Sequence, residues 1–438
     1  MRNRPDVPSD ACFTGPVVAV NGRVCRPELL GRRIALYSPG MVGIGHMRRN
    51  LLIAQSLASS RLQPIILMIA ETREANLLSM PPGGDCLTLP ALRKEASGEC
   101  RARYLDIPLS EVIALRAKAI SAALEAFRPD VLIVDHLPRG AFRELDAALE
   151  DLRGAGHTRC VLGLRDILED PDTVEREWAS AANEDAIRDY YDAVWIYGDP
   201  TVYDPVREYH LCARVAAKVQ FTGYLDCRSR PDNAVEVNPE VRAALPGPHE
   251  RLMLCTVGGG QDGADLAEAF ALAELPANAR AVLLMGPFMP ADVRQRLRHR
   301  AEENPRLHVL DFIANPEPLL RRAERVVAMG GYNTIYEVLS FEKHALVVPR
   351  SKPRHEQQIR ASRLRDLGLL DLLPPDQVSP EALSEWLARD LGAPVRIRER
   401  IDLNGTSRLP DLLEEVLLAP GSSDWSQTAG EEVQHVRS

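Results

Sequence analysis

His46 and Asp135 are the residues of this chain best suited to move a proton. His46 follows two glycines, Gly43 and Gly45, directly after an apolar run, and Asp135 ends another apolar run. An imidazole has an ordinary pKa of about 6.5, so it can take a proton from an attacking hydroxyl group, and a neighbouring carboxylate can orient it. We therefore expect His46 to act as a general base with Asp135 as its partner. The alternative is a tight glycine turn in which His46 makes only a local hydrogen bond.

Polar residues next to the same apolar runs predict a ligand-binding edge in the first half of the chain. His136 follows Asp135 and is a second candidate for the base, and Arg165 and Asp166 end a third apolar run. In sheets of parallel strands such positions lie at the carboxyl ends, where ligands bind. The residues predicted at this edge are Gly43, Gly45, Arg48, His136, Arg165 and Asp166. Each carboxylate could equally be satisfied within its own loop.

Three consecutive glycines, Gly258, Gly259 and Gly260, predict a phosphate-binding turn. They follow the apolar run 252–257 and precede a helical pattern. Glycines let an anion approach the backbone N–H groups, and the start of a helix favours negative charge. The alternative is a flexible turn in which Asp262 caps the helix.

The segment 329–337, MGGYNTIYE, enters another predicted helix. Thr334 and Glu337 are three residues apart and therefore share one helical face. Glu337 could accept hydrogen bonds from the two neighbouring hydroxyl groups of a ribose. The same pair is typical of a capping box, in which Thr334 caps the helix and Glu337 binds the N–H group of Thr334. Both interpretations stand at this point.

The loop 349–358, PRSKPRHEQQ, offers groups that suit a sugar. Glu356, Gln357 and Gln358 supply hydrogen-bond acceptors and amide donors near a helix start. Arg350 adds positive charge in an acidic protein. A solvated first helical turn would have the same composition.

These segments recur in an alternation of short apolar runs and longer amphipathic stretches, which predicts βαβ units and an α/β fold. We expect two doubly wound Rossmann-like domains, residues 31–228 and 250–418, that face each other across a cleft. A linker at 229–249, rich in proline, asparagine and charge, joins them. Residues 1–30 and 419–438 are predicted to be disordered tails. The stretches 78–104 and 167–190 are predicted loops of the first domain, and the second of them contains an acidic helical stretch at 172–190.

Composition excludes several classes of protein. The 438 residues are 45% hydrophobic and 26% charged, as in ordinary globular proteins, and no apolar run approaches the roughly 18 to 20 residues of a membrane helix. A net charge of −9 argues against a nucleic-acid partner bound over a broad basic surface. The eight cysteines contain no C-x-x-C pair, so neither a disulfide framework nor a metal site is expected. We expect a cytoplasmic enzyme.

With these segments in place, the chain resembles the GT-B glycosyltransferases, in particular the family 28 type and the related bacterial proteins described as predicted glycosyltransferases. Gly43, Gly45, His46 and Arg48 are similar to the glycine-rich turn with which that family faces its acceptor. The resemblance therefore implies that Gly43, Gly45, Arg48, His136, Arg165 and Asp166 form the acceptor side, with 78–104 and 167–190 as acceptor loops. Residues 310–358 are similar in order and spacing to its donor-binding region. Residues 331–334, GYNT, depart from the family 28 pattern towards the G-W-N-S of plant-type transferases, which leaves the sugar and the nucleobase open.

The resemblance implies a role for each donor-side residue. Glu337 would bind the ribose hydroxyl groups of a nucleotide-sugar, and His46 would correspond to the loop histidine that serves as base or positions the acceptor. The diphosphate would lie against Gly330, Gly331, Asn333 and Thr334, with Gly258, Gly259 and Gly260 closing over it. The sugar would be held by Gln357 and Gln358, with Glu356 beside them and Arg350 on the same side.

The implied activity is transfer of a hexose from a nucleotide-sugar, with a UDP-sugar expected, to an acceptor hydroxyl group. Inversion at the anomeric carbon is expected, with no metal ion or other cofactor. The acceptor stays open between a glycan, a lipid-linked molecule and a small molecule, and a lipid would bring peripheral contact with the inner face of the membrane. The alternatives are a nucleotide-sugar epimerase or hydrolase on the same fold and a non-catalytic nucleotide-binding protein. A dinucleotide oxidoreductase is disfavoured because neither glycine segment has the G-x-G-x-x-G spacing.

Overall fold

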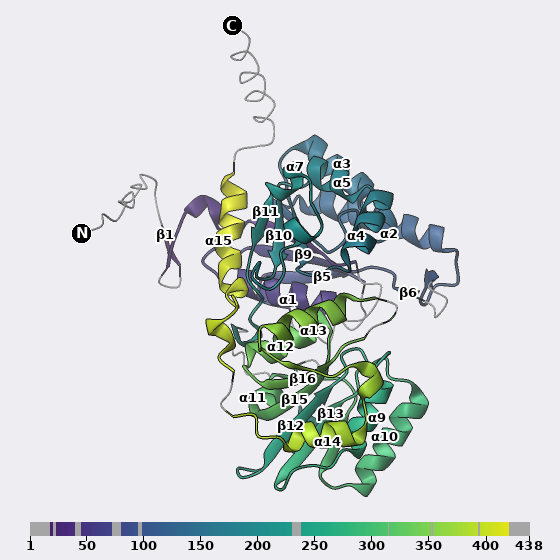
Figure 1. Ribbon diagram of the computed structural model, residues 1–438. Coiled ribbons are helices and arrows are strands. Elements are labelled where there is room, and N and C mark those ends of the chain that lie inside the picture. The colour runs from purple at the N-terminus through teal and green to yellow at the C-terminus, as the bar shows by residue number, and fades with distance from the viewer. Residues whose placement is uncertain are drawn as a thin grey trace, which may run out of the picture.

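The computed structural model describes residues 18–20, 23–39, 45–71, 80–94, 99–229, 238–313, 315–350, 352, 354–392 and 395–419. Within these ranges the chain forms two α/β domains, drawn one above the other in Figure 1. Gly43, residues 230–237 of the predicted linker and the greater part of both predicted tails lie outside the described residues.

A seven-stranded parallel sheet forms the centre of the N-terminal domain, in the order β11-β10-β9-β8-β3-β4-β5. Its strands are β3 (Arg33–Tyr37), β4 (Ile65–Ala70), β5 (Gly84–Thr88), β8 (Val131–Asp135), β9 (Arg159–Arg165), β10 (Ala193–Tyr197) and β11 (Val219–Phe221). The helices are α1 (Gly45–Ala58), α2 (Leu109–Phe127), α3 (Asp146–Ala155), α4 (Pro171–Ala181), α5 (Asn183–Tyr190), α6 (Pro205–Glu208) and α7 (Ala213–Ala216). Strands β8 and β10 are buried along their whole length, which explains their unbroken apolar character.

The C-terminal domain has a six-stranded parallel sheet in the order β14-β13-β12-β15-β16-β17. Its strands are β12 (Arg251–Thr256), β13 (Ala279–Leu284), β14 (Leu307–Leu310), β15 (Ala323–Met329), β16 (His344–Val348) and β17 (Asp371–Leu372). The helices are α8 (Pro239–Ala244), α9 (Ala264–Leu272), α10 (Ala291–Glu303), α11 (Glu317–Arg322), α12 (Tyr332–Ser340), α13 (Glu356–Asp366), α14 (Pro380–Ala388) and α15 (Gly405–Leu418). The two parallel sheets agree with the predicted pair of doubly wound domains.

The last helix, α15, packs on the N-terminal domain, beside β11 in Figure 1. Arg61, after α1, pairs with Glu414 at 2.5 Å and with Asp411 at 2.8 Å, and Ser56 Oγ donates to the carbonyl oxygen of Thr406 at 2.6 Å. In space, the domain predicted for residues 250–418 therefore ends before Gly405. Nothing in the local pattern of α15 reports this, because an amphipathic helix can bury its apolar face against either domain.

Three smaller differences concern the predicted tail and acceptor loops. Strand β1 (Val18–Val20) pairs with β2 (Arg23–Cys25), and a 3-10 helix at Pro27–Leu29 buries Leu29. Regular structure therefore begins before residue 31. The stretch 78–104 contains β5 and the hairpin of β6 (Leu92–Lys94) and β7 (Cys100–Ala102). The acidic helix breaks at Ala182, whose φ of 51° is left-handed, into α4 and α5. Further 3-10 turns span Ala141–Arg143, Cys227–Ser229, Pro375–Gln377 and Ile397–Glu399.

One apolar core runs from the N-terminal sheet into the C-terminal domain. It includes Leu52 of α1, Tyr224 after β11, and Tyr332 and Tyr336 of α12. This packing brings the start of α1 against the start of α12, which are the two helix starts where the sequence places its candidate residues. None of the described helices combines the length and the apolarity needed to cross a bilayer.

Candidate active site

The structure brings His46 and Asp135 into direct contact. Asp135 is the last residue of β8 and is completely buried, and His46 is the second residue of α1. Asp135 Oδ2 lies 2.7 Å from His46 Nδ1, and Asp135 Oδ1 accepts from Arg49 Nη2 at 2.5 Å. Because parallel strands end at one edge of the sheet, the turn after β3 and the end of β8 meet there. The arrangement leaves His46 Nε2 as the nitrogen that can face a ligand.

The charges around this pair favour a neutral histidine and an ionised aspartate. Burial alone would raise the pKa of Asp135, but Arg49 and then His46 hold that pKa well below its ordinary value. Burial lowers the pKa of His46, and the Asp135 carboxylate only partly opposes this. At neutral pH His46 is therefore a neutral imidazole next to a carboxylate, which is the state that a general base needs.

His136 lies beside the pair in a strained conformation. Its φ is 70°, which is uncommon for a residue with a side chain, and its ring centroid lies 5.2 Å from that of His46. Its buried Nδ1 has no hydrogen-bond partner among the described residues. Burial, followed by the charge of Arg165, holds the pKa of His136 well below its ordinary value. Arg165 therefore lies within electrostatic range of the histidines.

The first turn of α12 faces this edge from the C-terminal domain. The helix begins at Tyr332 with Gly331 as its N-cap and no capping side chain, so the capping-box interpretation of Thr334 and Glu337 is wrong. Glu337 is 7% exposed, and its Oε1 lies 3.5 Å from Nη1 of Arg48 on α1. The carboxylate therefore points at the domain interface.

Glycines of both domains converge on the same helix. A Cβ atom on Gly45 would lie 2.5 Å from Asn333 Nδ2, and one on Gly258 would lie 3.7 Å from Thr334 Oγ1. Gly258 and Gly260 have φ of 63° and 88°, which a glycine adopts without strain. The helix α9 starts after Gly263 with no capping side chain, so Asp262 is not its cap. The predicted phosphate turn and the α12 start are neighbours in space.

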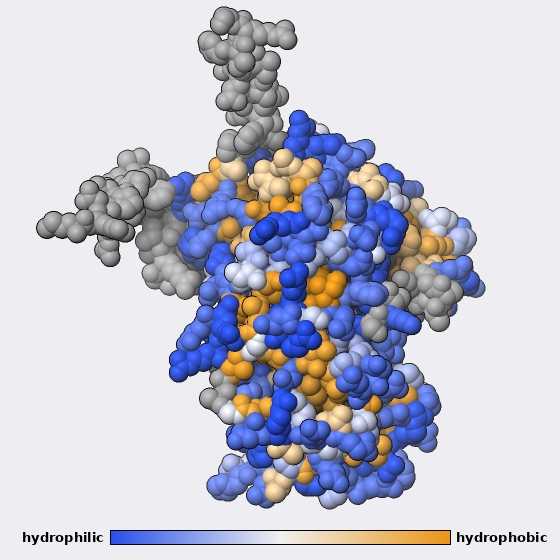
Figure 2. Space-filling view, viewed as in Figure 1, coloured by the Kyte–Doolittle hydropathy of each residue, from blue (hydrophilic) through white to orange (hydrophobic). Residues whose placement is uncertain are grey.

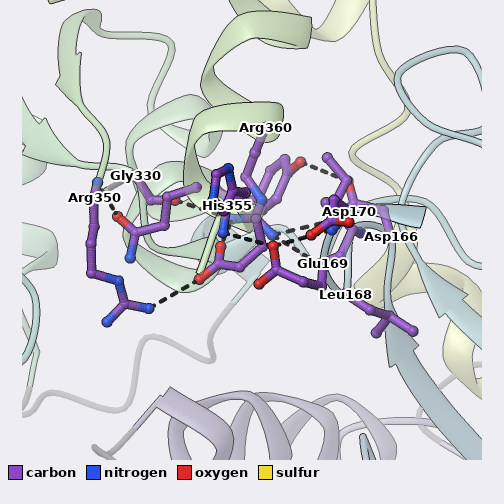
Figure 3. A network of polar contacts seen from close by, with 12 residues as sticks. Asp166, Leu168, Glu169, Asp170, Gly330, Arg350, His355 and Arg360 are labelled. Atoms are coloured by element: carbon purple, nitrogen blue, oxygen red, sulfur yellow. Dashed lines mark hydrogen bonds and ion pairs between the residues drawn. The ribbon is translucent and has the colours of Figure 1, made fainter. Parts of the chain in front are cut away.

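The polar residues of α13 complete the C-terminal side (Figure 3). Gln357 Oε1 accepts from the backbone N–H of Arg350 at 3.0 Å, and Arg350 Nη2 lies 3.5 Å from Glu356 Oε1. A Cβ on Gly330 would lie 3.0 Å from the Cβ of Gln357. Gln358 differs, because its amide donates along the helix to Ser362 Oγ at 3.3 Å.

Asp166 does not lie where an acceptor could touch it. It is completely buried, and its Oδ2 accepts from the hydroxyl groups of Tyr224 at 2.7 Å and Tyr336 at 3.0 Å. The structure therefore does not bring Asp166 to the surface of the predicted acceptor side. Asp166 does follow the end of β9, as the sequence predicts. A side chain at this position can point into the core as easily as towards a ligand at the edge of the sheet.

Sequence reasoning missed Arg49 and Tyr332. Arg49 is 3% exposed, and its guanidinium lies 5.6 Å from the ring centroid of Tyr197 and 5.4 Å from that of Tyr332. The hydroxyl group of Tyr332 donates to the carbonyl oxygen of Tyr197 at 2.6 Å and so joins the two domains. The three-residue spacing of His46 and Arg49 on one helix was the available signal.

The space between these groups is small. A pocket of about 20 Å³, about the size of one water molecule, is bounded by both domains. Its lining residues are Arg48, Arg49, Leu52, Leu225, Cys227, Tyr332, Asn333, Tyr336 and Glu337. Within the described parts of the chain, no cluster of three histidine, cysteine or carboxylate side chains could hold a metal ion.

Comparison with known proteins finds similarity for the C-terminal domain. Residues 253–416 match the model of the glycosyltransferase family 28 C-terminal domain. The chain is 28% identical over 142 residues to the UDP-N-acetylglucosamine--N-acetylmuramyl-(pentapeptide) pyrophosphoryl-undecaprenol N-acetylglucosamine transferase of Sulfurihydrogenibium sp. (strain YO3AOP1). That alignment covers 32% of this chain and 38% of the relative, so the chain spans well under half the length of the curated relative it matches.

Solved structures with the same fold include transferases and epimerases. The glycotransferase of kitacinnamycin superposes with a TM-score of 0.57 at 17% identity, covering 88% of this chain and 99% of that one. The UDP-GlcNAc 2-epimerase from Neisseria meningitidis, bound to UDP-GlcNAc, superposes with a TM-score of 0.56 at 13% identity, again over 88% and 99%. The likeness extends over both domains and establishes the GT-B fold.

Proposed function

Since the chain has the GT-B fold and residues 253–416 match the glycosyltransferase family 28 C-terminal domain, we propose that it transfers a sugar from a nucleotide-sugar to an acceptor hydroxyl group. The observation that carries the proposal is the contact of His46 with the buried Asp135, next to the start of α12. A base on one domain and a candidate donor site on the other suit a reaction between two substrates held in a cleft.

The donor is assigned to the C-terminal domain. Glu337 accepts hydrogen bonds from the ribose, the glycine turns at 258–260 and 330–331 receive the diphosphate, and Glu356 with Gln357 holds the sugar. A UDP-sugar is the expected donor, which the UDP-GlcNAc in the epimerase of the same fold supports. Arg350 lies close enough to Glu356 to share the sugar end of this site.

The reaction follows from the state of His46. Nε2 of the neutral imidazole takes the proton of the acceptor hydroxyl group while the oxygen attacks the anomeric carbon and the nucleoside diphosphate leaves. Asp135 stabilises the imidazolium that forms. The backbone N–H groups at the helix start and in the glycine turns stabilise the leaving diphosphate. We propose inversion by direct displacement, with these groups in place of a metal ion.

The acceptor is proposed to be lipid-linked. Exposed apolar side chains, Tyr104, Leu105 and Ile107, precede α2, and Leu115 follows on that helix. Figure 2 shows apolar surface at the edge of the upper domain. Exposed apolar side chains of this kind suit the interface of a membrane. Binding to anionic vesicles that is lost in Leu105→Glu would support peripheral contact, and equal binding of both proteins would contradict it.

A nucleotide-sugar epimerase is the second candidate, because epimerases share the fold at a similar TM-score. Incubation of the protein with UDP-GlcNAc alone separates the two functions. An epimerase converts the sugar without an acceptor, which proton NMR detects directly. A transferase leaves the sugar unchanged or, more slowly, hydrolyses it, and a non-catalytic binding protein does neither.

The first experiment measures thermal stabilisation of the wild type and of Glu337→Ala by UDP, GDP, dTDP, CDP, NAD and UDP- and GDP-sugars. A ligand at about 100 times its dissociation constant adds about 2.7 kcal/mol to the free energy of unfolding. We expect one nucleoside diphosphate to stabilise the wild type and not Glu337→Ala. Glu317→Ala, which removes a carboxylate paired with Arg321 on α11, is the control and should respond like the wild type. Absence of any shift, or a shift with NAD alone, would contradict the proposal.

A further inference from the structure

A buried polar network joins the two domains behind the candidate donor site. At its centre is Asp166, whose two tyrosine partners come from different segments. Tyr224 follows β11 of the N-terminal domain, and Tyr336 belongs to α12 of the C-terminal domain. The two tyrosine rings stack with centroids 3.8 Å apart and 16° between their planes. Asp166 is thus fixed by groups from both sides of the interface.

Arg360 of α13 connects this network to the donor side (Figure 3). Its side chain is completely buried. Towards the N-terminal domain, Nη2 donates to the carbonyl oxygen of Ile167 at 3.3 Å and lies 3.9 Å from Asp166 Oδ1. Towards its own domain, Nη1 donates to Glu356 Oε2 at 2.9 Å and to the carbonyl oxygen of Gly330 at 3.1 Å. One guanidinium group therefore touches the N-terminal domain, the glycine turn and the carboxylate assigned to the sugar.

A second contact holds the start of the same helix. Glu169, which is 2% exposed, accepts from the backbone N–H of His355 at 2.6 Å through Oε1. Its Oε2 lies 3.8 Å from Arg354, which also pairs with Glu177 of α4 at 2.8 Å. The residues immediately before Glu356 are therefore fixed by carboxylates of the N-terminal domain.

Separation of the domains would break these contacts together. Arg360 would keep Glu356 but lose both Ile167 and Asp166, and the backbone N–H of His355 would lose Glu169. A guanidinium group has five N–H donors in a fixed plane, so loss of the partners on one side frees it to turn. Arg360 would then be held only by Glu356 and the Gly330 carbonyl oxygen of its own domain, so the orientation that it gives to Glu356 would no longer be fixed from the N-terminal domain.

We propose that Arg360 is a positioning residue that couples contact between the domains to the binding of the donor sugar. Asp166 and the Ile167 carbonyl hold the guanidinium only when the domains touch, and the guanidinium then holds Glu356 in the orientation that binds sugar hydroxyl groups. The nucleoside diphosphate, assigned to Glu337 and the glycine turns, meets this guanidinium only at Gly330, whose carbonyl oxygen accepts from Arg360 at 3.1 Å. The inference rests on the proposed function. It adds that the orientation of Glu356, which holds the sugar, can change separately from Glu337, which holds the nucleotide.

The test compares the affinities for UDP and for a UDP-sugar by calorimetry in Arg360→Lys and in Arg363→Lys. Lysine keeps the charge but cannot reach Ile167, Gly330 and Glu356 at once. A hydrogen bond to a charged group contributes enough that its loss weakens binding about tenfold. We expect Arg360→Lys to bind the UDP-sugar about tenfold more weakly, with a raised KM for the donor, and to lose clearly less affinity for UDP, which meets Arg360 only through the Gly330 turn. Arg363, on the same helix, pairs across the interface with Glu208 at 2.8 Å and touches no donor residue, so Arg363→Lys should change neither affinity.

A second variant changes the other domain only. Asp166→Asn removes the charge opposite Arg360 without altering any residue assigned to the donor, and the same selective loss of sugar affinity is expected. Tyr336→Phe removes one hydrogen bond to Asp166 and should give a smaller loss of sugar affinity. It replaces Asp166→Asn in the test if that variant does not fold. Unchanged sugar affinity in these variants, or an equal loss of UDP affinity in Arg360→Lys, would overturn the coupling. Failure of the wild type to bind UDP at all would instead overturn the proposed function.

Discussion

Replacement of Asp135 by asparagine tests the proposed base, because the side chain keeps its size and loses its charge. Asp135 Oδ1 accepts from Arg49 and Oδ2 faces His46 Nδ1. Asparagine has one oxygen and one NH₂ group, and the guanidinium group of Arg49 requires the oxygen. The NH₂ group then donates to His46 Nδ1, so the proton of the neutral imidazole moves to Nε2. A protonated Nε2 cannot take the proton of an acceptor.

The size of the effect follows from what the base contributes. General-base catalysis supplies about 10²–10⁴-fold in rate, so kcat should fall by that factor, which is about 3–5 kcal/mol of activation free energy. The donor dissociation constant should stay within about threefold, because Glu337 and the glycine turns are unchanged. Arg49 loses the carboxylate that compensates its buried charge, so the free energy of unfolding should also fall by about 3 kcal/mol.

The assay measures release of the nucleoside diphosphate at saturating donor and acceptor, well below the unfolding temperature of the variant. Asp130→Asn is the matched control. Asp130 accepts from Arg32 Nη1 at 2.6 Å and from the backbone N–H of Arg33 at 2.8 Å, just before β8 and thus at the opposite edge of the same sheet. If Asp135→Asn and Asp130→Asn have kcat values within about threefold of each other, the assignment of the base is refuted.

Three further outcomes are expected. The kcat/KM profile should lose activity on the acid side only below the ordinary histidine pKa of about 6.5, because burial lowers the pKa of His46 and the base must be neutral; a limb above that value would contradict this. Glu144→Gln should lower the free energy of unfolding by about 3 kcal/mol in urea titrations without changing nucleotide affinity, since Glu144 pairs with the buried Arg116 through two hydrogen bonds far from α12. Gly45→Ala should raise the donor KM a few-fold, because its Cβ displaces Asn333, while the helix-forming methyl group keeps the thermal midpoint at or above that of the wild type.

Most of the fold could be predicted from the sequence because each strand is a short apolar run. Runs such as 131–134 and 194–197 are buried on both faces of a parallel sheet, so they lack alternation and stand out from the amphipathic helices. The edge strand β5 lacked that signal, since its residues are half-buried or exposed and none is buried. The predicted loop at 78–104 was wrong there for this reason.

The site could be predicted only in part. The positions of His46, Asp135 and Glu337 follow from the rule that ligands bind where parallel strands end. The contact of His46 with Asp135 depends on how α1 lies against β8, 89 residues later in sequence, and no local pattern reports it. Asp166 binds the hydroxyl groups of Tyr224 and Tyr336, which lie 58 and 170 residues away in the sequence, and no local pattern reports these contacts.

The buried arginines explain why the domain contact itself was not predicted. Arg49, Arg116 and Arg360 are at most 3% exposed, yet each lies in a helix where an arginine is ordinarily a solvated residue. A carboxylate from another segment compensates two of these charges, Asp135 for Arg49 and Glu144 for Arg116. Arg360 instead pairs with Glu356, four residues earlier on its own helix, and its contacts with Ile167 and Asp166 of the N-terminal domain are the ones that the sequence does not show. The sequence therefore displays each charge, but a contact that crosses the domain interface becomes recognisable only when the fold brings the two segments together.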